Sequence, residues 1–173
     1  MTNTNSLKKC LDETSGPLRI TNQFYSDEIL SKENIVCCIF LEVTFQNCQF
    51  QNVSFDSSVF TACQFDECVF SKSNFNGAHI RRSKFKNSKF IKSYLTKLEV
   101  EEVTFDSCKF EEVSFRKSYI EDSCFSHCAF ENIHENSSCS LITNSKISIN
   151  NYQSLLLEGD FDFYEVLKFL PLG

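Results

Sequence analysis

The sequence has 173 residues, of which 42% are hydrophobic and 14% aromatic, and it carries a formal net charge of −6. This size suits one domain with one core, and the sequence contains no apolar run long enough to cross a membrane. Because the first 17 residues are polar and lack the apolar centre of a signal peptide, we expect a cytoplasmic protein.

The N-terminal part of the sequence is polar and only loosely patterned. We expect residues 1–19, which contain a Gly16-Pro17 break, to form a flexible N-terminus. From residue 20 onwards large residues recur every five positions, but polar residues fill other sites that face inward (Gln23, Glu28 and Glu33). Residues 20–34 therefore predict an irregular N-terminal cap coil.

From residue 35 to residue 130 a large apolar residue occupies every fifth position without a gap. The series is Ile35, Phe40, Phe45, Phe50, Phe55, Phe60, Phe65, Phe70, Phe75, Ile80, Phe85, Phe90, Leu95, Val100, Phe105, Phe110, Phe115, Ile120, Phe125 and Phe130. Fifteen of the 19 Phe residues belong to it. A five-residue period fits neither a helix, with about 3.6 residues per turn, nor a continuous strand, with a period of about 2, so the chain must turn at every step.

Each five-residue unit has a second inward site, two residues before the large one. This site carries small or apolar residues, such as Cys38, Val43 and Ser58, and most other positions are polar. Two inward sites separated by two residues indicate a three-residue strand followed by a two-residue corner. Coils stacked at about 4.8 Å would bury the apolar side of such strands, so residues 35–133 predict a regular solenoid with the Phe rings inside.

The units CQF, CVF, SKF, CKF, VSF and CAF resemble the pentapeptide-repeat family, whose pattern is a small residue, a polar residue, Leu or Phe, and two variable residues. The resemblance implies an all-β solenoid, a right-handed quadrilateral β-helix with twenty residues per coil. Residues 20 apart would then lie on top of one another.

Charged residues 20 apart give mixed support for four sides. Opposite charges would stack in four pairs: Arg81 over Glu101, Arg82 over Glu102, Lys86 over Asp106 and Lys92 over Glu112. Like charges would stack in three others: Lys89 over Lys109, Lys97 over Lys117 and Glu101 over Glu121. The five-residue period alone leaves the number of sides open.

Charge is segregated along the repeats. Residues 79–98 form a basic band with seven cations and no acid: Arg81, Arg82, Lys84, Lys86, Lys89, Lys92 and Lys97. Residues 99–135 carry ten acids against three bases. Eight of these acids form a candidate partner-binding face: Glu99, Glu101, Glu102, Asp106, Glu111, Glu112, Glu121 and Asp122. The band does not favour direct nucleic-acid binding, because the predicted aromatic rings point inward and cannot stack on bases.

The regular series fails after Phe130 and resumes two residues out of phase at Ile142 and Ile147. We therefore expect a loop with a register shift at residues 134–139 and a last coil at residues 140–150. Residues 151–173 contain two apolar clusters and end near Pro171, which predicts a C-terminal cap of one or two short helices.

The core of this C-terminal region, SINNYQSLLLE, resembles the end of Qnr-type and MfpA-type pentapeptide-repeat proteins. The resemblance implies a two-fold dimer and a rod that imitates duplex DNA, binds type II topoisomerases (DNA gyrase and topoisomerase IV) and protects them from quinolones. The candidate dimer residues are Tyr152, Gln153, Leu155, Leu156, Leu157, Leu167, Phe169 and Leu170. This sequence departs from the group at residues 159–164, which look inserted, and in having no long loops between repeats.

The ten cysteines do not indicate a disulfide framework or a metal site. Six fall on the small inward position, where they serve as buried hydrophobes: Cys38, Cys48, Cys63, Cys68, Cys108 and Cys128. Cys48 and Cys68 would stack, as would Cys108 and Cys128, but zinc-type pairs of pairs are absent from the sequence. Cys37 and Cys124 face outward and are the candidates for reactive thiols.

Catalytic motifs are missing as well. The three His residues have no nucleophile or carboxylate pair at a recognisable spacing, and the four Gly residues form no phosphate-binding loop. We therefore expect no enzyme and no cofactor. Two hypotheses remain: a DNA mimic that modulates a type II topoisomerase, and a scaffold or adaptor that binds another protein through charged β-helix faces.

Overall fold

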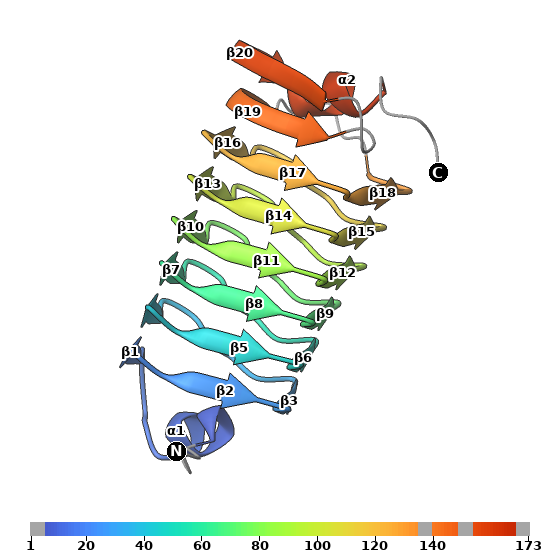
Figure 1. The fold of residues 1–173 in the computed structure, drawn as a ribbon. Coiled ribbons are helices and arrows are strands. Elements are labelled where there is room, and N and C mark those ends of the chain that lie inside the picture. The colour runs from blue at the N-terminus through green and yellow to red at the C-terminus, as the bar shows by residue number, and fades with distance from the viewer. Residues whose placement is uncertain (1–5, 135–139, 149–153, 169–173) are drawn as a thin grey trace.

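The computed structural model describes residues 6–134, 140–148 and 154–168. These residues form a tube of stacked coils that begins at a short N-terminal helix and ends at a strand pair and a second short helix (Figure 1). The predicted all-β solenoid is confirmed.

Three walls of the tube are built from three-residue strands. The first wall contains β1 (Arg19–Thr21), β4 (Ile39–Leu41), β7 (Val59–Thr61), β10 (His79–Arg81), β13 (Glu99–Glu101) and β16 (Tyr119–Glu121). The second contains β2 (Phe24–Ser26), β5 (Thr44–Gln46), β8 (Gln64–Asp66), β11 (Lys84–Lys86), β14 (Thr104–Asp106) and β17 (Cys124–Ser126). The third contains β3 (Ile29–Ser31), β6 (Gln49–Gln51), β9 (Val69–Ser71), β12 (Lys89–Ile91), β15 (Lys109–Glu111) and β18 (Ala129–Glu131).

The pairing register settles the number of sides. Phe40 pairs in parallel with Phe60, and Phe45 with Phe65, so strands of one wall are separated by 20 residues. The fourth wall is held by isolated parallel bridges that follow the same spacing, from Asn34 to Ser54 and on to Ser114. Each coil therefore has four five-residue sides, as the predicted quadrilateral β-helix requires.

The corners explain how the chain turns every five residues. The second residue after each inward large residue adopts a left-handed conformation, as at Glu42 (φ 55°), Ala62 (φ 54°) and Glu67 (φ 55°). This conformation costs a residue with a side chain about 1–2 kcal/mol. Hydrogen bonds between coils offset the cost, since the Glu67 amide donates to the Lys86 carbonyl at 2.9 Å. Gly77 is the only glycine at these corners among the described residues.

The interior consists of columns of Phe rings. Rings one coil apart lie nearly parallel: the centroids of Phe65 and Phe85 are 4.5 Å apart with an interplanar angle of 3°. Rings on adjacent walls meet edge to face, as Phe60 and Phe65 do at 5.7 Å and 66°. Both arrangements suit the charge distribution of an aromatic ring, so the rings pack closely along the centre of the tube.

The second inward site links successive coils. The Ser58 hydroxyl accepts a hydrogen bond from the Cys38 amide at 3.0 Å and donates one to the Ile35 carbonyl at 2.7 Å. Ser83 likewise accepts from the Cys63 amide. Within the described residues every buried side-chain nitrogen and oxygen has a hydrogen-bond partner. A small hydroxyl or thiol is thus favoured here because it fits beside the rings and satisfies buried backbone groups.

The N-terminal end differs from the sequence prediction. Helix α1 (Leu7–Asp12) lies within residues 1–19, which were expected to be flexible, and Leu7 is fully buried. Glu28 holds the helix start, because its carboxylate accepts from the Ser6 hydroxyl at 2.9 Å and from the Leu7 amide at 3.1 Å. Residues 20–34 form strands β1–β3 in register with the next coil, and the polar residues Gln23, Glu28 and Glu33 lie outside these strands. Glu28 and Glu33 bind the helix that covers this coil.

The C-terminal end also differs in part. Strand β19 (Leu141–Ser148) continues both the first and second walls, with Ile142 paired to Ile120 and Ile147 to Phe125, so the register moves by two residues here. Strand β20 (Ser154–Asp162) then runs antiparallel to β19. The Leu cluster at 155–157 therefore forms a strand and not the predicted helix. Its alternation fits this result, since Leu156 is exposed and Leu157 buried.

A short helix does close the tube, as predicted. Helix α2 (Phe163–Leu167) begins at Asp162, whose side chain accepts from the amides of Tyr164 and Glu165. Phe163 is buried against Phe115, Phe125 and Phe130 at the end of the ring columns. In the described part of the chain, neither helix has the length and apolar content needed to cross a membrane.

Candidate protein-binding surfaces

The eight acids of the candidate face do not share one wall. Glu99 and Glu101 lie on β13 and Glu121 on β16, in the first wall, whereas Asp106 ends β14 in the second wall and Glu111 ends β15 in the third. Glu102, Glu112 and Asp122 occupy corners. The structure thus divides the predicted face between several sides of the tube.

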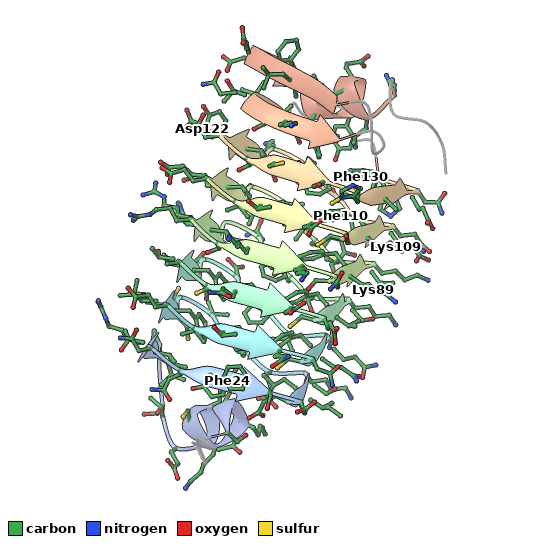
Figure 2. All side chains as sticks on the ribbon, viewed as in Figure 1. Phe24, Lys89, Lys109, Phe110, Asp122 and Phe130 are labelled. Carbon is green, nitrogen blue, oxygen red and sulfur yellow. The ribbon has the colours of Figure 1, made fainter. Side chains whose placement is uncertain are left out.

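Four of these acids do gather, along the edge between the first and second walls. Glu101 and Glu121 stack in register, and the corner residues Glu102 and Asp122 follow them directly in the chain. Asp160 of β20 extends the row, because Thr143 pairs with Glu121 on one side and with Asp160 on the other. We call this row of Glu101, Glu102, Glu121, Asp122 and Asp160 the acidic edge; Asp122 is labelled in Figure 2. Sequence reasoning missed Asp160, since it lies in the segment that looked inserted.

The spacing of the acidic edge approaches that of a nucleic-acid backbone. Two carboxylates per coil, with coils about 4.8 Å apart, give about one carboxylate per 2.4 Å of axis. Duplex DNA carries about one charge per 1.7 Å of axis. The field also acts on a nearby phenol: the pKa of Tyr119 is raised, first by desolvation and then by the carboxylates of Glu121 and Asp160.

Several acids of the candidate face are neutralised by neighbours. Glu101 pairs with Arg81 at 2.9 Å. Glu99 contacts the His79 ring at 2.8 Å. On the other side of the tube, Glu112 pairs with Lys92 and Glu111 with Lys109. Glu102, Glu121 and Asp122 form no ion pair with the described residues, so the acidic edge carries a net negative charge.

The basic band encircles the tube as one coil. Arg81 and Lys92 form the ion pairs just described, as the stacking of residues 20 apart predicted. The other five members form no ion pair with any described residue: Arg82, Lys84, Lys86, Lys89 and Lys97. Lys86 does lie in register with Asp106, but no ion pair joins them. Three of these five cations, Arg82, Lys84 and Lys86, lie on the second wall and the corner that precedes it.

The stacked lysines of the third wall show how like charges are accommodated. Lys89 and Lys109, labelled in Figure 2, are partners in the β12–β15 register. The Lys109 ammonium contacts Glu131 and Glu111, each at 2.9 Å. Hydrogen bonds to these two carboxylates raise the pKa of Lys109. Glu111 and Glu131 therefore compensate the repulsion between Lys89 and Lys109 on this wall.

The cysteines mostly lie inside the tube. Cys38, Cys48, Cys63, Cys68 and Cys108 are buried, and Cys128 is partly buried. Burial raises the pKa of the Cys63 thiol to about 11. Of the two candidate reactive thiols, Cys37 is exposed, whereas Cys124 is partly buried and its pKa is raised by desolvation. No group of three or more His, Cys, Asp or Glu side chains that could hold a metal ion occurs in the described residues.

The candidate dimer residues do not all face outward. Leu156 is 62% exposed, whereas Leu157, on the inward side of β20, is buried and Leu167 packs against the core. Leu155 belongs to β20, and Tyr152, Gln153, Phe169 and Leu170 lie outside the described residues. Phe161, at 40% exposed, and Leu141, at 37%, add apolar surface at this end that the sequence did not single out.

Comparison with protein families identifies a pentapeptide repeat region at residues 38–107. This match agrees with the pattern recognised in the sequence and with the twenty-residue coils. The comparison with curated proteins gave no match.

Solved structures with similar coils share little sequence with this chain. A trypsin-treated variant of QnrB1, a plasmid-mediated fluoroquinolone resistance protein, is 14% identical, with 75% of this chain and 81% of that chain covered and a TM-score of 0.35. The pentapeptide repeat protein Rfr23 from the cyanobacterium Cyanothece 51142 is 6% identical, with coverages of 68% and 91% and a TM-score of 0.41. HetL from Nostoc sp. strain PCC 7120, a pentapeptide repeat protein involved in heterocyst differentiation regulation, is 5% identical, with coverages of 73% and 79% and a TM-score of 0.21.

Proposed function

Because this chain is a pentapeptide-repeat protein, we propose that it works without catalysis, as a rod that binds a type II topoisomerase such as DNA gyrase or topoisomerase IV. The acidic edge is the observation that carries the proposal. Its carboxylates follow one another along the tube axis at a spacing close to that of DNA phosphates. The resemblance of SINNYQSLLLE to the Qnr-type and MfpA-type ends supports the same assignment.

The acidic edge would act through its long-range field. A topoisomerase groove that neutralises DNA phosphates carries an excess of positive charge, and this charge attracts Glu102, Glu121 and Asp122 in the same way. The basic band is repelled by such a groove. The rod would therefore engage through its C-terminal coils, and binding would weaken as the salt concentration rises.

A supercoiling assay with DNA gyrase, with and without a quinolone, tests this function. We expect micromolar protein to inhibit supercoiling or to protect the enzyme from the drug. The double variant Glu102→Lys with Asp122→Lys should need at least a tenfold higher concentration. A matched double variant far from the acidic edge, Glu42→Lys with Glu67→Lys, changes the charge equally and should act like the wild type. Absence of any effect of the wild-type protein, or equal loss in both double variants, would refute the proposal.

The dimer implied by the C-terminal resemblance is part of the proposal. Leu156 is the candidate whose exposed side chain best fits a contact with a second copy, because a leucine exposed to this extent gains free energy when it is covered. Sedimentation of the wild-type protein should give the mass of a dimer, and Leu156→Asp should give a monomer. A wild-type monomer at all concentrations would remove the dimer from the proposal.

A second candidate function is a scaffold or adaptor that binds an acidic protein through the basic band. The specific observation in its favour is that Arg82, Lys84 and Lys86 lie together on the second wall and its corner without ion pairs to described residues. Reversing these three charges should abolish capture of such a partner from a cell extract, while Glu102→Lys with Asp122→Lys should not. The two functions therefore respond to opposite sets of variants.

A further inference from the structure

In the part of the chain that the structure describes, one edge of the last strand of the tube has no partner strand. Within the described residues β20 pairs only with β19, and it is the outermost strand of the sheet at the C-terminal end (Figure 1). Its nine residues make it longer than any other strand of the described chain. The backbone amides and carbonyls of the free edge point along the tube axis and can receive a further strand.

This edge lacks most of the features by which proteins protect a terminal strand. β20 contains no Pro and no Lys, and it is not short. The opposite end of the tube is different, because strands β1, β2 and β3 have three residues each and helix α1 is bound over them by Glu28 and Glu33. In the described residues, only the register shift opposite Thr143–Ser145 and the acids of the strand hinder the pairing of β20 with a further strand.

The charges around the edge define the chemistry of a partner. β20 carries Glu158, Asp160 and Asp162, and Glu121 and Asp122 lie below it, whereas Lys146 is the one base of β19 and β20. Phe161 adds a ring that is 40% exposed. Two antiparallel copies of β20 would bring these carboxylates together, which disfavours a second copy of this chain. A strand with basic and apolar side chains would instead be attracted.

We propose that the free edge of β20 binds an extended segment of alternating basic and apolar residues, which adds to the sheet as one more strand. The surface is distinct from the Leu156 side chain, because an outward side chain stands perpendicular to the wall while the edge faces along the axis. The proposal does not depend on topoisomerase binding. Leu156→Asp tests the dimer, and changes at the edge test the added strand.

The test uses a fluorescently labelled eight-residue peptide of alternating lysine and valine. Its control has the same composition but D-valine at every valine, which keeps charge and hydrophobicity and prevents a regular strand. We expect the all-L peptide to bind at least tenfold more tightly, to raise hydrogen-exchange protection of β20 amides, and to bind at least fivefold more weakly to Asp160→Lys. Glu42→Lys, which makes the same charge change at a corner far from β20, should bind like the wild type.

Three results would overturn the proposal. Equal binding of the all-L and D-valine peptides would show electrostatic adsorption without a strand. Protection of amides elsewhere than in β20 would place the peptide on another surface. Protection of β20 amides that grows with protein concentration in the absence of peptide would show that a second copy occupies the edge.

Discussion

Replacing Phe65 by Ala should reduce the free energy of unfolding by about 4–5 kcal/mol. The ring is 2% exposed and lies flat between Phe45, at a centroid distance of 5.0 Å, and Phe85, at 4.5 Å. Edge contacts with Phe60 and Phe70, each at 5.7 Å, complete its surroundings. A buried Phe→Ala change costs about 3–5 kcal/mol, and each well-placed ring pair adds about 0.5–1.5 kcal/mol.

The tube has little means to close the resulting cavity. Strand β8 is paired in parallel to β5 below and β11 above, so the backbone at residue 65 is fixed on both sides. The cost of a cavity depends on how far its walls can relax. The free energy of unfolding lost in Phe65→Ala should therefore lie at the upper end of the range for buried Phe→Ala changes.

Urea unfolding followed by circular dichroism measures the effect, and Phe24→Ala is the matched control. Phe24, labelled in Figure 2, is at the first, outward position of β2 and is 47% exposed, so its removal should cost less than about 1 kcal/mol. If the two variants differ by less than about 1 kcal/mol, the inward stacking of the five-residue series does not stabilise the fold.

Three further predictions concern the cap, a corner and a buried thiol. Glu28→Ala should remove the anchor of helix α1, cost about 1–2 kcal/mol, and abolish hydrogen-exchange protection of the α1 amides before that of the coils. Gly77→Ala should cost about 1–2 kcal/mol in thermal unfolding, the cost of the left-handed conformation alone, because the added Cβ would lie 3.7 Å from the nearest side-chain atom and Ala62 already adopts the equivalent conformation. Burial raises the pKa of the Cys63 thiol from 9.0 to about 11, so the folded protein holds this proton more tightly than the unfolded chain does. This difference contributes to the free energy of unfolding in full below pH 9. About 2–3 kcal/mol of that free energy is lost as the pH rises through 11. Cys63→Val, which introduces the residue found at Val43, the same inward site one coil earlier on the same wall, should remove this part of the pH dependence in urea unfolding.

Each of these three has a result that contradicts its premise. Unchanged α1 protection in Glu28→Ala would mean that burial of Leu7 alone holds the helix. A loss well above about 2 kcal/mol in Gly77→Ala would mean that this corner differs from that at Ala62. The same pH dependence in Cys63→Val as in the wild type would assign it to other groups.

Much of the fold follows from short-range pattern. Inward and outward positions repeat within five residues, and each unit is a strand and a corner, so burial at Phe40, Phe65 or Phe110 could be predicted one unit at a time. The number of sides could not, because it depends on which residues pair between coils. The register of 20 residues between Phe40 and Phe60 decides it.

The candidate surface was predicted less completely than the core. The sequence located the acids and the basic band, but an acid's position on one wall or another depends on the coil geometry. Ion pairs then change its effect, since Glu101 is neutralised by Arg81 while Glu102, one residue later, forms no ion pair with the described residues. Asp160 joined the acidic edge only because β20 folds back on β19.

The sequence by itself determined the repeating coil and its aromatic interior, because those features depend on residues a few positions apart whose apolar side chains must avoid water. Only the tertiary structure decided the two ends. Helix α1 is held by a carboxylate 21 residues away from Leu7, and the Leu cluster at 155–157 became a strand because β19 offered an edge to pair with. Such contacts join segments with no common local pattern, so they form only after the coils have brought the partners together.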